Sequence, residues 1–432
     1  MCCPDVALPI NVSGSPSTRL SEAVAEFRVD LAFGSLGQAK EHPTRDAAKA
    51  ATRATAKAAT REAATATARA TPHNKRWKSC IFGPVQNKTI IKGRGAQRNP
   101  HNRYDNLRYD EVPDPEDELR TQLIPTHPKT ILNKITSPDL GMGYGLNAYQ
   151  GCEHGCVYCF ARPTHQYWGY SAGLDFERKI LYKAEAPDLL RAALRKKSYQ
   201  PQPIMMSGNT DSYQPAEKQL GITRACIEVL LEHGHPFGLI TKNSLILRDL
   251  DLIARAAQDD LVHVCLSITT LDEDVRRYVE PRTASIAQRF RAVEGLSRAG
   301  VPVTVNIAPV IPGLTDHEIM GIAERAAACG ARKIGYSVVR LNDEVADVFT
   351  DWVHQAYPDR AERILNRIRD CRGGELGEKR FGIRHRGEGP IAQLIKAQFD
   401  LARRRFFPGE ADWPDYNFAL FERWRRPQLS LF

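Results

Sequence analysis

Three cysteines lie within eight residues of one another, in the segment GCEHGCVYCF at residues 151–160. They are Cys152, Cys156 and Cys159, with the spacing C-x3-C-x2-C. Thiolates are soft ligands, so three of them on one loop can bind a single metal centre. Structural zinc would need a fourth protein ligand, and only His154 and Glu153 lie inside the loop. A [4Fe–4S] cluster held by three cysteines instead leaves one iron open to an external ligand. The spacing favours the cluster, with structural zinc as the alternative.

The other cysteines are too few and too scattered for a disulfide framework, since the whole chain of 432 residues has ten. The N-terminal sequence MCCPDVALPI has neither the basic nor the apolar region of a secretory signal. No apolar run reaches the ~18 residues that a membrane helix needs. We therefore expect a cytoplasmic protein without a membrane segment.

From residue 144 onward, β-rich and helical stretches alternate. Six strands, each followed by a helix, indicate a parallel sheet with right-handed crossovers, in either a doubly wound sheet or a partial barrel. No G-x-G-x-x-G follows the first strand, which disfavours a dinucleotide-binding sheet. In both architectures the functional groups lie past the carboxyl ends of the strands. The predicted strands are 144–150, 204–207, 237–241, 262–268, 303–307 and 333–339, and the predicted helices are 186–197, 216–233, 247–257, 285–299, 316–329 and 344–357.

The cysteine spacing, with Tyr158 before the last cysteine and after the first strand of six βα units, resembles the radical S-adenosylmethionine (SAM) superfamily. Segments 240–253, 266–285 and 306–316 are similar to the group related to spore photoproduct lyase, often described as DNA-repair-photolyase-like. The resemblance implies an α/β fold, a (βα)6 partial TIM barrel with N- and C-terminal extensions. It also implies a [4Fe–4S] cluster on the three cysteines, with SAM bound to the open iron. Reductive cleavage of SAM would then yield a 5′-deoxyadenosyl radical that abstracts a substrate hydrogen.

The same resemblance implies cofactor contacts at the ends of the strands. Tyr158 belongs to the cluster motif, and the residues past the second strand would hold the methionine amino end of SAM. Lys242 and Ser267 would contact its carboxylate or ribose, and Asn306 and Pro309 its nucleoside. Ordinary strand-end capping or turn chemistry is the alternative for each. The residues past the second strand are Ser207, Gly208, Asn209, Thr210 and Asp211.

One departure from the spore enzyme concerns its chemistry. That enzyme has a cysteine near the end of the second strand that returns a hydrogen atom to the product radical. Here the segment reads Met205-Met206-Ser207, and the nearest other thiol is Cys226, one helix away. This difference argues against identical thymine-dimer repair.

Two features near the cluster loop have two interpretations each. The run His165–Tyr170 contains four aromatic or imidazole rings, which could stack a nucleobase or shield the cluster from water. Arg282 could bind an anionic substrate or the cofactor carboxylate, or form a salt bridge to Glu280.

The net charge of +9 lies in the flanks, because residues 151–360 carry 24 Lys and Arg against 26 Asp and Glu. We predict a low-complexity tail at 1–75 and an extended arm with basic and acidic stretches at 76–143. The barrel spans 144–357, and a basic helical extension follows at 358–432. The tail includes an Ala-, Thr- and Arg-rich tract without large apolar residues to bury.

The C-terminal flank suggests a polyanionic partner. The loop 380–390 carries Arg380, Arg384 and Arg386 beside glycines, and could contact phosphates. A helix over 391–406 presents Ile391, Leu394, Ile395, Phe399 and Ala402 on one face.

The terminal peptide resembles the motif by which bacterial repair proteins dock on the sliding clamp. Folding back to plug the barrel is the alternative for this tail. The peptide consists of Gln428, Leu429, Ser430, Leu431 and Phe432.

The sequence and this resemblance thus predict a radical SAM enzyme that acts on nucleic acid, in DNA repair or modification, and that needs a low-potential electron donor. A radical SAM enzyme that modifies RNA or protein is an alternative. A non-catalytic nucleic-acid-binding protein with structural zinc is the alternative from another class.

Overall fold

The computed structural model describes residues 91–104, 120–409 and 413–425. The predicted tail at 1–75 and the terminal peptide Gln428–Phe432 lie outside these ranges. In the described part, no helix is both long and apolar enough to cross a bilayer.

The main sheet has seven strands in the order β10-β9-β8-β7-β6-β3-β2. Six of them are parallel, and each lies beside its neighbour in the chain, with β2 antiparallel at one edge. A doubly wound sheet would reverse this order in the middle, so the (βα)6 partial barrel is confirmed. The strands are β2 (Leu132–Lys134), β3 (Tyr144–Leu146), β6 (Ile204–Met206), β7 (Phe237–Thr241), β8 (Val262–Ser267), β9 (Val303–Val310) and β10 (Lys333–Val338).

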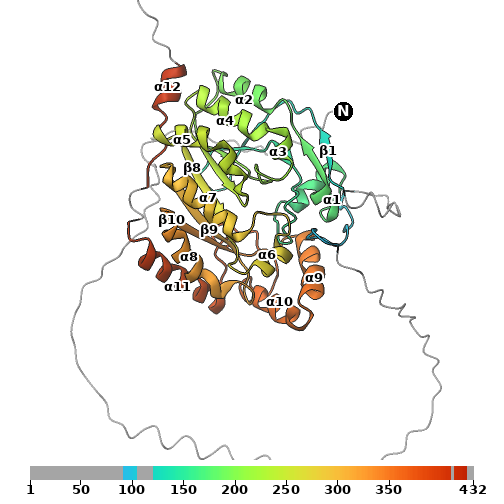
Figure 1. Cartoon of the computed structure of the whole chain (residues 1–432). Helices are drawn as coiled ribbons and strands as arrows, with labels where there is room; N and C mark the ends of the chain where they lie inside the picture. Colours follow the sequence, from blue (N-terminus) through green and yellow to red (C-terminus); the bar gives the residue numbers. More distant parts are fainter. Residues whose placement is uncertain (1–90, 105–119, 410–412, 426–432) are drawn as a thin grey trace, which may run out of the picture. The chain divides into compact units, whose positions relative to one another are not determined.

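Helices follow the parallel strands and bury the outer face of the sheet (Figure 1). One helix expected over 216–233 is two, because Gly221 takes a left-handed φ of 65° that ends the first helix. The helices are α1 (Leu174–Arg178), α2 (Ala186–Leu194), α3 (Glu217–Leu220), α4 (Ile222–Glu232), α5 (Leu250–Gln258), α6 (Glu273–Val279), α7 (Ile286–Arg298), α8 (Ile319–Ala328), α9 (Glu344–Ala356), α10 (Ala361–Asp370), α11 (Gly389–Phe406) and α12 (Ala419–Arg425).

A second sheet of three strands, which the sequence did not predict, lies beside the first βα unit. It has the order β1-β5-β4, with β1 (Gln122–Pro125), β5 (Lys179–Tyr182) and β4 (Tyr149–Gln150). The strand expected over 144–150 is therefore divided between the two sheets. The described part of the predicted arm supplies β1 to this sheet and β2 to the main sheet.

The amino end of the barrel is closed by the chain that follows α11. The Tyr416 ring lies 3.9 Å from the ring of His263, at the start of β8. Its hydroxyl lies 3.1 Å from the position that a Cβ on Gly238 would occupy. The Trp413 ring is 4.8 Å from the same histidine. The barrel interior is thus closed at the end opposite to the carboxyl ends of its strands.

The apolar face predicted for α11 is partly wrong. Ile395, Phe399 and Ala402 are buried as expected, together with Ala392. Leu394 is 58% exposed, because it lies on the side of the helix that faces away from the sheet.

The predicted phosphate loop at 380–390 is tied to the protein in the structure. Arg384 donates to the Asp139 carboxylate over 2.6 Å, and the Gly382 amide donates to the same group over 3.0 Å. The loop also holds the β10 edge, since the amide of Val338 donates to the carbonyl of His385 over 2.9 Å. Asp139 precedes β3, which is the last parallel strand in the sheet order, whereas β10 is the first. The contact therefore spans the open side of the partial barrel.

The other two arginines of this loop also have contacts within the chain. Arg380 pairs with Glu378 and with Glu388, over 2.5 and 2.7 Å. The Arg386 guanidinium lies 4.7 Å from the centre of the Tyr336 ring. The loop therefore has a structural role that the sequence did not predict.

We predict that Asp139→Ala lowers the free energy of unfolding by about 1–3 kcal/mol, because it leaves the mostly buried Arg384 without its carboxylate. Urea denaturation followed by circular dichroism measures the change. Glu324→Ala, at an exposed position of α8, is the matched control and should change stability little. Equal stability of the two variants would refute this role of the Asp139–Arg384 pair.

Candidate active site

The loop that carries the three cysteines follows β4 and is buried from Gly151 through Tyr158. It turns at Gly151 and Gly155, whose φ angles of 80° and 66° favour glycine. Backbone hydrogen bonds fix it on both sides: Cys152 N donates to the carbonyl of Phe176 over 2.8 Å, and Val157 N to that of Val279 over 3.1 Å. The thiols are therefore presented by a rigid backbone.

The three thiols have the chemistry that a [4Fe–4S] cluster requires. None of them forms a disulfide, and burial raises the pKa of each. Neighbouring thiols of the loop add to this rise in pKa for Cys152 and Cys156. Among the described residues, no three His, Cys, Asp or Glu side chains are grouped so that they could hold one metal ion, as the zinc alternative requires. In a cluster each thiolate binds its own iron, so the donors need not meet at one point.

His154 anchors the cluster loop to the ends of two strands. Its Nδ1 lies 3.4 Å from the Asp211 carboxylate, and its Nε2 lies 3.2 Å from the side-chain nitrogen of Asn243. Asp211 also accepts from the Thr241 hydroxyl over 2.7 Å and from the amide of Lys242 over 2.8 Å. Although burial opposes ionisation, His154 and these donors lower the pKa of Asp211 to about 2. Asp211 thus acts as a charged link between the loop and β7.

Tyr158 anchors the same loop through its hydroxyl group. Its hydroxyl donates to the carboxylate of Glu280, which is fully buried and paired with Arg289. Burial disfavours the charged form of Glu280, but Arg289 and Lys242 outweigh it and lower its pKa to about 2. The hydroxyl of Tyr158 is thereby engaged by the protein, and the Lys242 ammonium lies over its ring.

The predicted residues past the second strand lie together beside the cluster loop. Ser207 adopts a left-handed φ of 82° and bonds Ser212, which shapes a tight turn at the end of β6. The Asn209 amide donates to the Asn147 side chain over 2.8 Å, and the Thr210 hydroxyl to the carbonyl of Tyr149 over 3.4 Å. A Cβ on Gly208, the residue between Ser207 and Asn209, would lie 3.7 Å from the Asn147 side chain, which is an ordinary van der Waals contact. These hydrogen bonds hold the turn in place beside the cluster loop.

Lys242 and Ser267 lie at the carboxyl ends of β7 and β8, as predicted. The Lys242 ammonium is 5.9 Å from the centre of the Tyr158 ring, and its charge lowers the pKa of Cys156 against the larger effect of burial. Ser267 is buried, and its carbonyl accepts from Arg289 over 3.0 Å. Lys242 thus lies close enough to the cluster loop for its charge to act on Cys156 and Cys159.

Asn306 lies inside β9, which extends through Val310 and not only to residue 307 as predicted. It pairs in register with Ser267, so it faces the barrel below the mouth. Pro309, near the end of the same strand, lies at the mouth. The assignment of both to the nucleoside of SAM stays a prediction.

The structure identifies a barrel-facing thiol that the sequence reasoning missed. Cys226 is buried on α4 among side chains of the outer core, so it does not face the barrel. Cys265 of β8 lies on the inner face between His263 and Ser267, and burial raises its pKa to about 12. Strand alternation, with buried Val264 and Leu266 facing the helices, was the signal that could have identified it.

The structure shows where the run His165–Tyr170 and Arg282 lie relative to the cluster loop. His165 is buried, whereas Tyr167 and Trp168 are 73% and 44% exposed, so the run does not act as one shield. Arg282 pairs with Glu153 of the cluster loop over 3.1 Å. Of the two interpretations of Arg282, the bridge to Glu280 is not formed, and Arg289 pairs with that carboxylate instead.

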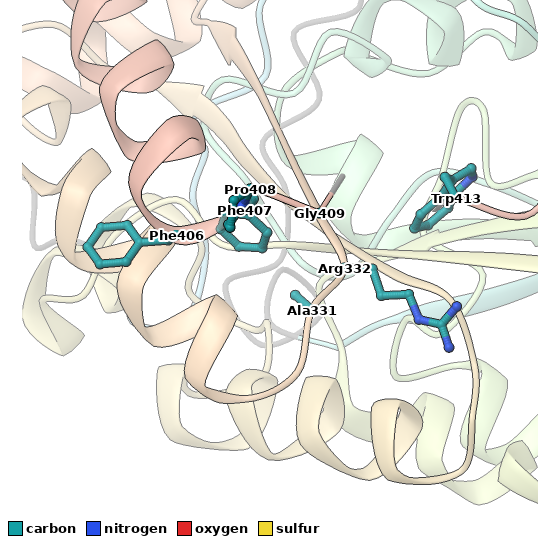
Figure 2. A pocket seen from close by; sticks show the side chains of 7 residues that line it. All are labelled: Ala331, Arg332, Phe406, Phe407, Pro408, Gly409 and Trp413. Carbon is teal, nitrogen blue, oxygen red and sulfur yellow. The ribbon is translucent and has the colours of Figure 1, made fainter. Parts of the chain in front are cut away.

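A pocket of about 380 Å³ lies away from this site, at the amino end of β10 (Figure 2). It is lined by Arg332 on one side and by Phe406 and Phe407 at the end of α11 on the other. No cluster-loop residue lines it, so the chemistry belongs to the opposite end of the barrel.

The geometry defines a class of protein: a partial α/β barrel with three thiols for an iron–sulfur cluster at the carboxyl ends of its strands. Residues 146–326 match the Radical SAM superfamily. An uncharacterised protein of Mycobacterium tuberculosis is 34% identical over 238 residues, which are 54% of this chain and 70% of that protein. The chain therefore belongs to the radical SAM superfamily, and its cofactors are a [4Fe–4S] cluster and SAM.

The chain is also similar to a solved structure of a lyase and to a phage protein. Spore photoproduct lyase complexed with dinucleoside spore photoproduct shares the fold, with a TM-score of 0.50 and 16% identity over 70% of this chain and 86% of that chain. A protein named Radical SAM Nalpha-GlyT isomerase, from Pseudomonas phage M6, is 21% identical over 225 residues, or 52% of this chain and 45% of that protein.

We predict that Cys156→Ala abolishes binding of the cluster, because two thiolates cannot hold it in place of three. Iron analysis and visible absorption after anaerobic reconstitution measure the loss. Cys226→Ala removes a thiol outside the barrel and is the matched control, with iron content expected to equal that of the unaltered protein. A full iron complement in Cys156→Ala would contradict the assignment.

We also predict that Lys242→Met weakens SAM binding about tenfold, the order expected for the loss of one charged hydrogen bond. Equilibrium dialysis on the cluster-loaded protein measures the affinity. Lys218→Met, at an exposed position of α3, should leave it unchanged. An unaltered affinity in Lys242→Met would assign this lysine to another partner.

Proposed function

We propose that this radical SAM enzyme acts on a nucleobase within nucleic acid. The cluster and SAM, when bound, supply a 5′-deoxyadenosyl radical after one electron arrives from a low-potential donor protein. The barrel contributes a floor at Tyr416 and His263, which would shield the bound cofactors from solvent at that end. The free thiols of the site need a reducing compartment, which supports a cytoplasmic location.

The observation that carries the proposal is a group of two rings, each with an arginine beside it, near the cluster loop, which we call the ring–cation strip. It consists of Phe160, Arg340, Arg384 and Phe381. Phe160 directly follows the last cluster cysteine, and the Arg340 guanidinium lies 5.4 Å from its ring centre. Arg384 lies 4.6 Å from the centre of the Phe381 ring. The two rings are 54% and 57% exposed.

Arg340 is the cation of the strip that is free to bind a ligand. Arg384 is held by Asp139, whereas Arg340 makes no hydrogen bond or ion pair with a described residue. Burial lowers the pKa of Arg340 and so does the charge of Arg384, whereas the weaker effect of the Asp139 carboxylate acts in the opposite direction. An anion in direct contact with Arg340 would therefore stabilise its charged form. A phosphate is an anion that a guanidinium binds well, in a two-pronged contact.

Exposed rings with cations beside them can bind single-stranded nucleic acid. Bases stack on aromatic side chains without regard to sequence, while the cations meet the backbone phosphates. A base taken out of its stack could then enter the barrel mouth beside Phe160. The dinucleoside ligand of the structurally similar spore photoproduct lyase supports a substrate of this class.

We predict that Phe160→Ala and Arg340→Gln each weaken binding of a single-stranded oligonucleotide about fivefold to tenfold, through the loss of one stacked base or one phosphate contact. Fluorescence anisotropy with DNA and RNA strands measures the affinity, and Arg340→Gln should also flatten the salt dependence. Arg332→Gln, an exposed arginine at the opposite end of the barrel, is the control.

The same two variants should still cleave SAM slowly without substrate, because neither side chain is among the residues assigned to the cofactor. If they bind both nucleic acids as well as the unaltered protein does, the strip is not the nucleic-acid site. Binding that no salt concentration weakens would point instead to a protein or small-molecule substrate.

We further propose that the terminal residues Gln428–Phe432, which lie outside the described ranges, dock on the sliding clamp. The support is their sequence pattern, together with their position just after α12, which Phe421 anchors in the core. A pull-down with the Leu431→Ala and Phe432→Ala double variant tests this partner: unchanged capture of the clamp would dismiss it.

A further inference from the structure

We infer that residues 91–104, which we call the strap, form a cover that holds the cluster loop closed and limits access of water and oxygen to the cluster. Glu177 of α1 is the positioning residue that fastens it. The strap lies outside the 146–326 segment that matches the superfamily. The inference goes beyond the proposed function, because it concerns the stability of the cluster and not the substrate.

The Glu177 carboxylate is fully buried and joins three parts of the chain. One oxygen accepts from the Gly95 amide of the strap over 3.0 Å. The other accepts from the Ala96 amide over 2.8 Å and from the Arg162 guanidinium over 2.5 Å. A buried carboxylate with three donors is well satisfied, so the strap is held by charge-assisted hydrogen bonds.

Arg162 carries this connection to the cluster loop itself. Its side chain is fully buried, and two of its nitrogens donate to the carbonyl of Cys156, over 3.0 and 2.9 Å. A third nitrogen donates to the carbonyls of Ala172 and Gly173, over 3.2 and 3.0 Å. The central cysteine of the motif is thereby linked through Arg162 and Glu177 to the strap.

The strap also touches the cluster loop directly. A Cβ on Gly95 would lie 1.8 Å from the carbonyl oxygen of Gly155, which stands between two cluster cysteines. A Cβ on Gly155 would in turn lie 2.8 Å from the Glu177 carboxylate. Only glycines allow the two backbones to approach this closely. The contact leaves no room for solvent between the strap and the loop at this point.

The strap continues from the cluster side to the other edge of the open barrel (Figure 1). Near α1, Asn99 donates to Asp175 over 3.2 Å and accepts from its amide over 2.9 Å. Beyond it, Arg103 donates to Glu344, the first residue of α9, over 2.8 Å. Ala96 packs between α1 and α9 in one apolar cluster with Leu174 and Val348. The strap thus joins the loop after the first barrel strand to the helix after the last.

The consequence for the cluster follows from this connection. A [4Fe–4S] cluster with one open iron is sensitive to solvent and oxygen, so its lifetime depends on how often its loop opens. Opening requires the strap to leave Gly155, which would expose the Glu177 carboxylate and leave Arg162 without its partner. The buried pair therefore keeps the open population small.

The test uses the full-length, reconstituted protein and measures the rate at which the cluster absorption bleaches in air. We expect Glu177→Gln to bleach about tenfold faster, because replacing a charged hydrogen bond by a neutral one shifts an opening equilibrium by that order. Gly95→Ala keeps the Glu177–Arg162 pair but displaces the strap from Gly155, and should bleach faster as well. Limited proteolysis within the strap should be faster in both variants.

Two controls separate this role from a general loss of stability. Asp139→Ala should lower stability through its contacts to the loop 380–390, and not through a contact to the cluster loop. It should bleach at the rate of the unaltered protein. Glu324→Gln controls for the change of charge. If Glu177→Gln does not fold, the bleaching rate of Gly95→Ala alone tests the role of the strap.

Bleaching of Gly95→Ala at the unaltered rate would overturn the inference, as would equally fast bleaching of Asp139→Ala. No nucleic acid is present in the assay, so its outcome is independent of the substrate proposal.

Discussion

The structure depends on holding a loop of three thiols rigid and dry. Two fully buried ion pairs do this from opposite sides. Glu280 and Arg289 hold Tyr158, whereas Glu177 and Arg162 hold the carbonyl of Cys156. Burying such charges is costly unless every donor and acceptor is satisfied, and here hydrogen bonds to the backbone complete each pair. Their value is positional, because they fix where the three thiols that would hold the cluster lie relative to the barrel.

A barrel of six strands leaves a side open, and the chain closes it with segments from outside the βα units. The strap joins the cluster side to α9, the Asp139–Arg384 contact joins the two edges of the sheet, and the segment around Tyr416 forms the floor. Each closure uses residues from a flank of the chain. The flanks, which carry the excess of positive charge, are therefore partly structural, and many of their arginines are neutralised by carboxylates within the protein.

This use of the arginines changes how the net charge of +9 relates to function. Charge summed along the sequence counts Arg103, Arg380 and Arg384 as available to a polyanion, but each is paired with Asp or Glu in the fold. Arg340, which nothing in the local sequence distinguished, has no such partner among the described residues and lies beside an exposed ring. Which cations can bind a ligand is decided by pairing, and pairing is a property of the tertiary structure.

The sequence by itself determined the cluster motif, the six βα units and the placement of polar groups at strand ends, because these depend on local spacing and on periodicity. It did not reveal the second sheet, Glu177 or the strap, since these depend on partners that are distant in the chain, such as Gly95 and Glu177, which are 82 residues apart. It also did not indicate that Arg282 pairs with Glu153 while Arg289 pairs with Glu280. Local chemistry can be inferred from neighbours in the chain, whereas burial and pairing exist only once distant segments have met.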